Sequence, residues 1–125
     1  MKVIINTSDA PAPIGPYNQA ILLNDTLYVS GQIPLNPATG KLVEGDIKDQ
    51  ALQVMKNLDA ILKAAGMNFS NVVKSSIFLK DMKDFPNVNL VYGTFFKSDP
   101  PARETVQVAG LPMNVDVEIS CIAVK

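Results

Sequence analysis

Arg103 is the only arginine in the chain, and it follows two prolines in Asp99-Pro100-Pro101-Ala102-Arg103. Proline fixes its own φ angle and cannot donate a hydrogen bond to a sheet, so we expect Arg103 where a rigid loop enters a strand. A guanidinium presents a planar fork of donors that suits a carboxylate or a phosphate. The alternative is a structural ion pair with a nearby aspartate or glutamate.

Three other polar residues, Asn89, Thr105 and Glu118, stand among apolar neighbours. Asn89 falls on the apolar stripe of a predicted helix, where an amide without partners costs about 1–3 kcal/mol. Alternatively, it lies at the helix rim and bonds to backbone. Glu118 is in the middle of a predicted strand, and Arg103 is its obvious strong partner. It could otherwise form a plain structural pair with Arg103, or lie exposed on a sheet edge.

Thr105 is two residues from Arg103 and therefore on the same face of the predicted strand. Its hydroxyl could hold a water beside whatever Arg103 binds, although β-propensity alone would also explain a threonine there. Cys121 lies in a run of aliphatic residues, which favours an unreactive core position over a reactive thiol.

Two short segments at predicted strand ends, Gly15-Pro16-Tyr17 and Ser30-Gly31-Gln32, complete the candidates. Tyr17 can offer an apolar wall with a polar tip, and Gly31 would allow a ligand to approach the backbone closely. Ordinary turns also use glycine and proline, so both segments have a purely structural alternative.

The residue types that are missing narrow the chemistry. The chain contains no histidine and one cysteine, which argues against a histidine-dependent nucleophile and against a metal site. It carries no glycine-rich phosphate-binding motif, so we expect no bound nucleotide cofactor. Any catalysis is then left to carboxylates, hydroxyls, backbone amides, water and Arg103. The net charge of −1, without a basic run, argues against a nucleic-acid partner.

Length and composition predict one domain over residues 1–125, because 125 residues with 47% apolar content can bury a sizeable core. A single cysteine excludes an internal disulfide. No apolar run has the length of a signal peptide or of a membrane span. We therefore expect a cytoplasmic protein that does not bind membranes.

The hydrophobic periodicity predicts six strands and two helices in the order β-β-β-α-β-α-β-β. One helix begins after Asp46, a predicted N-cap, and ends before Gly66; the other spans residues 85–96, with Asp84 as its cap. The strands are predicted at residues 2–6, 17–23, 26–31, 72–79, 104–108 and 115–124, with a loop at 32–45. This pattern favours an α+β domain in which both helices pack on one face of one sheet.

The other face of that sheet would be left uncovered, yet the strands lack the charged outer face typical of a solvated sheet. One side of the last strand carries Asp116, Glu118, Ser120, Ile122 and Val124. Small polar groups mixed with aliphatic residues fit a face that packs against another copy of the sheet. We therefore predict a homo-oligomer.

Taken together, these motifs resemble the Rid deaminases (the RidA/YjgF type) over essentially the whole chain. The matching segments include Gly15-Pro16-Tyr17-Asn18-Gln19-Ala20, Val29-Ser30-Gly31-Gln32-Ile33-Pro34, Asn71-Val72-Val73-Lys74, Phe78-Leu79-Lys80-Asp81-Met82, Pro101-Ala102-Arg103 and Val117-Glu118-Ile119. The resemblance implies a chorismate-mutase-like fold with a six-stranded mixed sheet, assembled as a homotrimer with sites between subunits. It also implies cofactor-free hydrolysis of reactive 2-imino acids or enamines to 2-oxo acids and ammonia, a metabolite damage-control activity or a pathway step.

Carried over by position, the resemblance implies that Arg103 binds the substrate carboxylate and that Glu118 orients the attacking water. Pocket-lining residues would be Tyr17, Ser30, Gly31, Asn89 and Thr105. This chain departs from the usual pattern at Asn18, where members with deaminase activity mostly carry serine, and at Thr105, where they carry cysteine. These departures motivate one alternative, a module that binds small carboxylates such as 2-oxo acids without turnover. A second alternative is an endoribonuclease or translation inhibitor, an activity attributed to some relatives.

Overall fold

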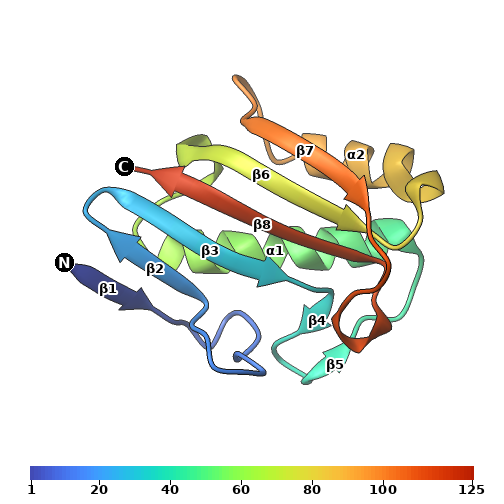
Figure 1. The fold of residues 1–125 in the computed structure, drawn as a ribbon, viewed down its shortest axis with the longest axis horizontal. Coiled ribbons are helices and arrows are strands. Elements are labelled where there is room, and N and C mark those ends of the chain that lie inside the picture. The colour runs from blue at the N-terminus through green and yellow to red at the C-terminus, as the bar shows by residue number, and fades with distance from the viewer.

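Six strands form one mixed sheet in the order β1-β2-β3-β8-β6-β7 (Figure 1). The computed structural model describes residues 1–125. The strands of this sheet are β1 (Lys2–Ile5), β2 (Ala20–Leu23), β3 (Thr26–Gln32), β6 (Val72–Leu79), β7 (Ala102–Gln107) and β8 (Val117–Val124). The β6–β7 pair is parallel and the other pairs are antiparallel. The predicted six-stranded mixed sheet is confirmed.

Two α-helices lie in the sequence between these strands, α1 (Ile47–Ala64) and α2 (Phe85–Gly93). The predicted start of α1 is confirmed, because the Asp46 side chain accepts hydrogen bonds from the backbone N–H groups of Lys48 and Asp49. Its end is confirmed by Gly66, whose φ of +74° is the left-handed value that glycine adopts readily. No helix in the structure combines the length and the apolar character needed to cross a membrane.

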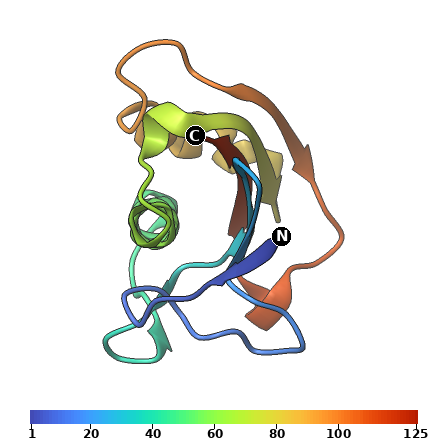
Figure 2. The same cartoon turned by 90° about the vertical axis from the view of Figure 1, so that its left-hand side faces the viewer.

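Both helices pack on one face of the sheet. Figure 2 shows α1 end-on beside the curved sheet, with no helix on the opposite side. The burial of side chains along β8 alternates accordingly. Val117, Ile119 and Ala123 are fully buried under the helices, whereas Glu118 and Ile122 on the other side are partly exposed. We call the helix-covered side the helix face and the other side the open face.

The open face carries several large apolar side chains, although no helix covers it. Tyr28, Leu23 and Ile4 are each about half exposed there, at 48%, 43% and 53%. Strand register places them beside Ile122 and Thr26 on the same side of the sheet. This mixture agrees with the composition of the strands from which we predicted a homo-oligomer.

Several predicted boundaries were wrong. Helix α2 ends at Gly93 rather than at residue 96, and Asp84 precedes it without a side-chain capping bond. The strand predicted from Tyr17 begins at Ala20, and the one predicted from Val115 begins at Val117.

The predicted loop 32–45 contains a small hairpin, β4 (Leu35–Asn36) and β5 (Lys41–Leu42). A buried amide holds it in place: Asn57 of α1 donates to the backbone oxygens of Ile33 and Leu35, at 3.1 and 3.0 Å. This contact joins residues 22 and 24 positions apart, so local patterning gave no sign of the hairpin.

Candidate active site

Arg103 is the second residue of the edge strand β7, directly after the two prolines. Its Nη1 donates to Asn89 Oδ1 of α2 at 2.7 Å. No ion pair in the structure includes Arg103, so the structural ion pair considered as an alternative is not formed within the chain. Asn89 is exposed rather than buried, and its partner is the guanidinium and not backbone.

Two aromatic side chains of α2 provide the rest of the guanidinium's surroundings. The Arg103 Cζ atom lies 5.0 Å from the centre of the Tyr92 ring and 5.6 Å from that of Phe85. Both distances are within the range of a cation–π interaction. Sequence patterning had placed both rings only on an apolar helix face, and nothing in that pattern marked them as neighbours of Arg103.

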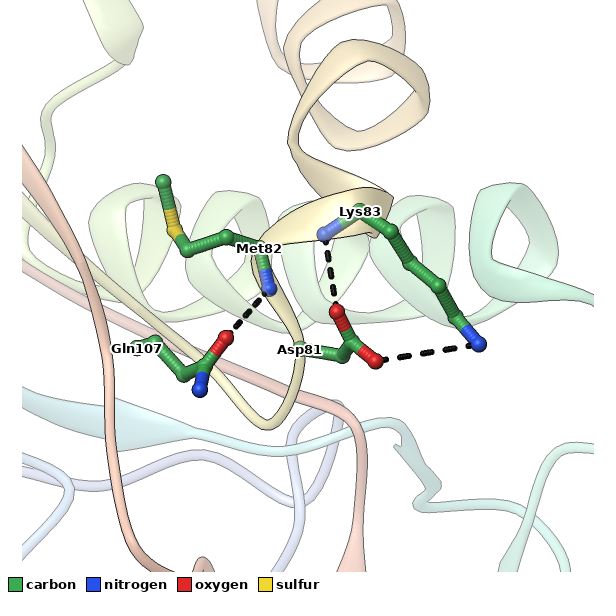
Figure 3. A network of polar contacts seen from close by, with 4 residues as sticks. All are labelled: Asp81, Met82, Lys83 and Gln107. Atoms are coloured by element: carbon green, nitrogen blue, oxygen red, sulfur yellow. Dashed lines mark hydrogen bonds and ion pairs between the residues drawn. The ribbon is translucent and has the colours of Figure 1, made fainter.

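Strand β7 is also tied to the beginning of α2 by its last residue. Figure 3 shows the Gln107 side chain accepting a hydrogen bond from the backbone nitrogen of Met82, at 2.8 Å. Met82 begins the short 3-10 turn that leads into α2, and Asp81 caps this turn by accepting from the Lys83 backbone nitrogen at 2.9 Å. The strand that carries Arg103 is therefore bonded to α2 near its first residue and to the turn before α2 at its last residue.

Thr105 lies on the same face of β7 as Arg103, as the two-residue spacing predicts. It sits opposite Ile77 of β6 in the parallel register, and Ile77 is buried under the helices. The Thr105 hydroxyl is buried and has no hydrogen-bond partner within the chain. The hydroxyl is thus positioned on the helix face with its bonding capacity unused.

Glu118 occupies β8 between β3 and β6, so it does not lie on a sheet edge. The carboxylate is partly buried and has no cationic partner, and burial raises its pKa above the usual value. Gly31 packs directly against it: a Cβ atom at Gly31 would collide with the Glu118 carboxylate. Glycine at this position thus permits the close approach of the Glu118 carboxylate, and any larger residue would force that side chain to shift.

Tyr17 and Ser30 lie near this carboxylate strand, on the loop before β2 and on β3. The Ser30 hydroxyl donates to the Asn18 backbone oxygen at 2.6 Å, and the Tyr17 hydroxyl accepts from the Ile14 nitrogen at 3.3 Å. A hollow of about 370 Å³ on the open face includes Tyr17 and Ser30. A narrower one of about 20 Å³, room for a single water, lies between Tyr17 and Gly31.

Gln19 holds the loop that presents Tyr17, and sequence reasoning did not single it out. Its side chain is 2% exposed and bonds the backbone of Thr7, Ala10 and Pro11. A glutamine that satisfies several backbone groups of one loop fixes that loop in place. The only available signal was its position within the Gly15–Ala20 motif.

The predicted site residues thus fall into two groups on opposite faces of the sheet. Arg103 pairs in register with Ser75, which is buried under the helices. Glu118 pairs with Phe78, three residues further along β6 and therefore on the other side. The helix-face group is Arg103, Asn89 and Thr105, and the open-face group is Tyr17, Ser30, Gly31 and Glu118. The pairing of Arg103 with Glu118, expected from sequence, does not occur within one chain.

Cys121 is buried beneath α1, and burial raises the pKa of its thiol to about 12. A thiol with so high a pKa remains protonated near neutral pH and is a poor nucleophile. The interpretation of Cys121 as an unreactive core residue agrees with this environment.

A family model described as Endoribonuclease L-PSP matches residues 7–125. The chain belongs to this family. It is 50% identical over 125 residues to the 2-iminobutanoate/2-iminopropanoate deaminase of Mus musculus, covering all of this chain and 93% of that protein. The resemblance to the Rid proteins is thereby confirmed.

Solved structures of the family have the same fold. The Rid-family protein YyfA of Yersinia pestis superposes with a TM-score of 0.97, at 48% identity and with both chains fully covered. Escherichia coli TdcF, solved with bound serine, superposes with a TM-score of 0.94 at 42% identity, covering 98% of each chain. These likenesses confirm the α+β fold with its mixed sheet and two helices.

Proposed function

We propose that this protein hydrolyses 2-imino acids, or their enamine tautomers, to 2-oxo acids and ammonia. The name of the mouse relative, 50% identical over the whole chain, supports this class of substrate. The observation that carries the proposal is the Arg103 guanidinium, which is held by a neutral amide and by rings and keeps an uncompensated charge. A small organic anion is the partner that such a group lacks.

The reaction needs few components. Arg103 would bind the carboxylate and so fix the C=N carbon in place, which makes the encounter with water effectively intramolecular. Water adds to that carbon while the nitrogen gains a proton, and the resulting aminoalcohol expels ammonia to leave the 2-oxo acid. Glu118, with its raised pKa, would orient the water and exchange the proton.

We also propose that each site forms between two subunits of a homotrimer. One chain presents its Arg103 group and its Glu118 group on opposite faces of the sheet, so a single subunit cannot bring both to one substrate. Three copies closed around their open faces would bury the apolar side chains there and place the Arg103 edge of one subunit against the Glu118 region of the next. A cytoplasmic location, expected from the sequence, remains a prediction.

Replacing Arg103 tests the proposed activity. With 2-iminopropanoate generated in situ, we expect Arg103→Ala to lower kcat/KM by about 10- to 150-fold, which corresponds to losing a charge-assisted hydrogen bond of about 1.5–3 kcal/mol. Arg103→Lys keeps the charge without the planar fork and should fall between the two. Equal rates for wild type and Arg103→Ala would refute the proposal.

The same assay separates the two alternatives. Binding of 2-oxobutanoate without turnover would favour a carboxylate-binding module, for which Asn18 and Thr105 are the motivating departures. The family description names an endoribonuclease, so cleavage of single-stranded RNA by wild type belongs in the same experiment. The net charge of −1 leads us to expect no cleavage.

A further inference from the structure

The Arg103 guanidinium is stabilised without any carboxylate. Guanidinium has five N–H donors in one plane, and the structure uses one of them, in the bond to Asn89. The contacts with Tyr92 and Phe85 are made over ring faces, at 5.0 and 5.6 Å. A ring face attracts the positive charge without accepting an in-plane hydrogen bond. The remaining donors are therefore left for a ligand.

Tyr92 is itself fixed more firmly than a surface ring would be. It is 5% exposed, and its ring packs against Phe96 with centroids 4.8 Å apart. Phe96 in turn meets Phe69 edge-on at 5.4 Å. The Tyr92 hydroxyl is buried beside the Ser75 side chain and makes no well-formed hydrogen bond. The polar groups around Tyr92 are therefore Ser75 and the cation that lies over its ring face.

We propose that Tyr92 is a positioning residue for Arg103: its ring holds the guanidinium in place while leaving the donors free to bind a carboxylate. This inference rests on the proposed function, in which Arg103 binds the substrate. A carboxylate in the place of Tyr92 would compete for those donors. An aliphatic residue would leave the guanidinium free to turn toward solvent.

The test compares three variants by their affinity for 2-oxobutanoate and by their thermal stability. Tyr92→Leu removes the ring, and we expect the Kd to rise about 5- to 30-fold, the equivalent of a cation–π contact of about 1–2 kcal/mol. Tyr92→Phe keeps the ring and should restore most of that affinity. Val88→Ala is the matched control, because Val88 is buried one turn earlier on the same helix at 1% exposure.

If Tyr92→Leu weakens binding no more than Val88→Ala at an equal loss of Tm, Tyr92 acts only as a core residue and the inference fails. It also fails if Tyr92→Phe binds as weakly as Tyr92→Leu. If Arg103→Ala binds 2-oxobutanoate like wild type, the proposed function fails instead, whatever the Tyr92 variants do.

A measurement on the unaltered protein covers the case in which Tyr92→Leu does not fold. Because Arg103 is the only arginine, the chain gives a single arginine Nε–H signal in a proton–nitrogen spectrum. A ring stacked on the guanidinium displaces the Arg103 side-chain proton resonances upfield through its ring current. Resonances at the positions of free arginine would overturn the inference without any substitution.

Discussion

The helix-face region around Arg103 and the open-face region around Glu118 each contain one ionisable group without a partner of opposite charge, but the two groups have opposite environments. Arg103 stays partly exposed and is steadied by two rings and an amide. Glu118 is partly buried, has no cation beside it, and has a raised pKa because burial disfavours its charged form. One region keeps a permanent charge available, and the other holds a carboxyl group whose pKa is raised by burial.

If the site works as proposed, neither region would suffice alone. A cation that must bind an anion should not be neutralised in advance, and a carboxyl group that exchanges protons works best with a raised pKa. Placing both on one face of one chain would let them pair and cancel each other. Their separation by the sheet prevents that pairing within one chain.

The strongest test of the difference between the two regions is to form trimers from a mixture of two variants, each altered in one region. Arg103→Ala and Glu118→Gln homotrimers should each retain no more than about a tenth of the wild-type rate. In a randomly mixed trimer, about one interface in four would unite an intact Arg103 with an intact Glu118. We therefore expect unfolding and refolding the two variants together to recover about a quarter of the wild-type deaminase rate.

The control for this experiment mixes two variants that are both altered in the open-face region. Glu118→Gln mixed with Gly31→Ala cannot rebuild an intact open-face region, so that mixture should show no recovery. Recovery in neither mixture, from trimers verified by light scattering, would mean that each site lies within one subunit.

The second prediction concerns the close contact between Gly31 and Glu118. Gly31→Ala places a methyl group where the carboxylate lies, so Glu118 must move. We expect deaminase activity to fall about 100-fold, since a displacement of roughly 1 Å in a reacting group can cost that much. Gly110→Ala is the control, because a Cβ there meets no atom within 4 Å. Equal activity for the two variants would show that the carboxylate position is not critical.

Much of this arrangement could be predicted from local sequence. The two prolines placed Arg103 at the start of a strand, and Asp46 and Gly66 defined the ends of α1. The two-residue spacing placed Thr105 on the same face as Arg103. Each of these predictions depends on residues a few positions apart, where sterics and hydrogen bonding act directly.

The unpredicted features all depend on contacts between distant segments. Asn89 and Arg103 are 14 residues apart, and their bond requires α2 to lie across the edge of β7. The separation of Arg103 from Glu118 depends on the register of β6 with both neighbouring strands. A strand's own pattern says which residues share a face, but it does not say which face of the assembled sheet that will be.

The smallest effect that we predict is on stability, and it compares two glutamates of the open face. Burial raises the pKa of Glu118, so the folded state holds this proton more tightly than the unfolded chain. The resulting stabilisation is full below the unfolded pKa and is lost as the pH rises through the raised value. Glu118→Gln should therefore raise Tm slightly near pH ~7, and the gain should vanish near pH ~4.

Glu104 should behave in the opposite way. Lys74 and Ser76 hydrogen-bond to its carboxylate and lower its pKa, so its contribution is present at neutral pH and is lost as the pH falls. Glu104→Gln should thus lower Tm at neutral pH only slightly or not at all, because the side chain is exposed and solvent screens the pair. A fall in Tm for Glu118→Gln at neutral pH would mean that a cation rests against Glu118 in the assembled protein. That cation would come from a neighbouring subunit, because no cation pairs with Glu118 within one chain.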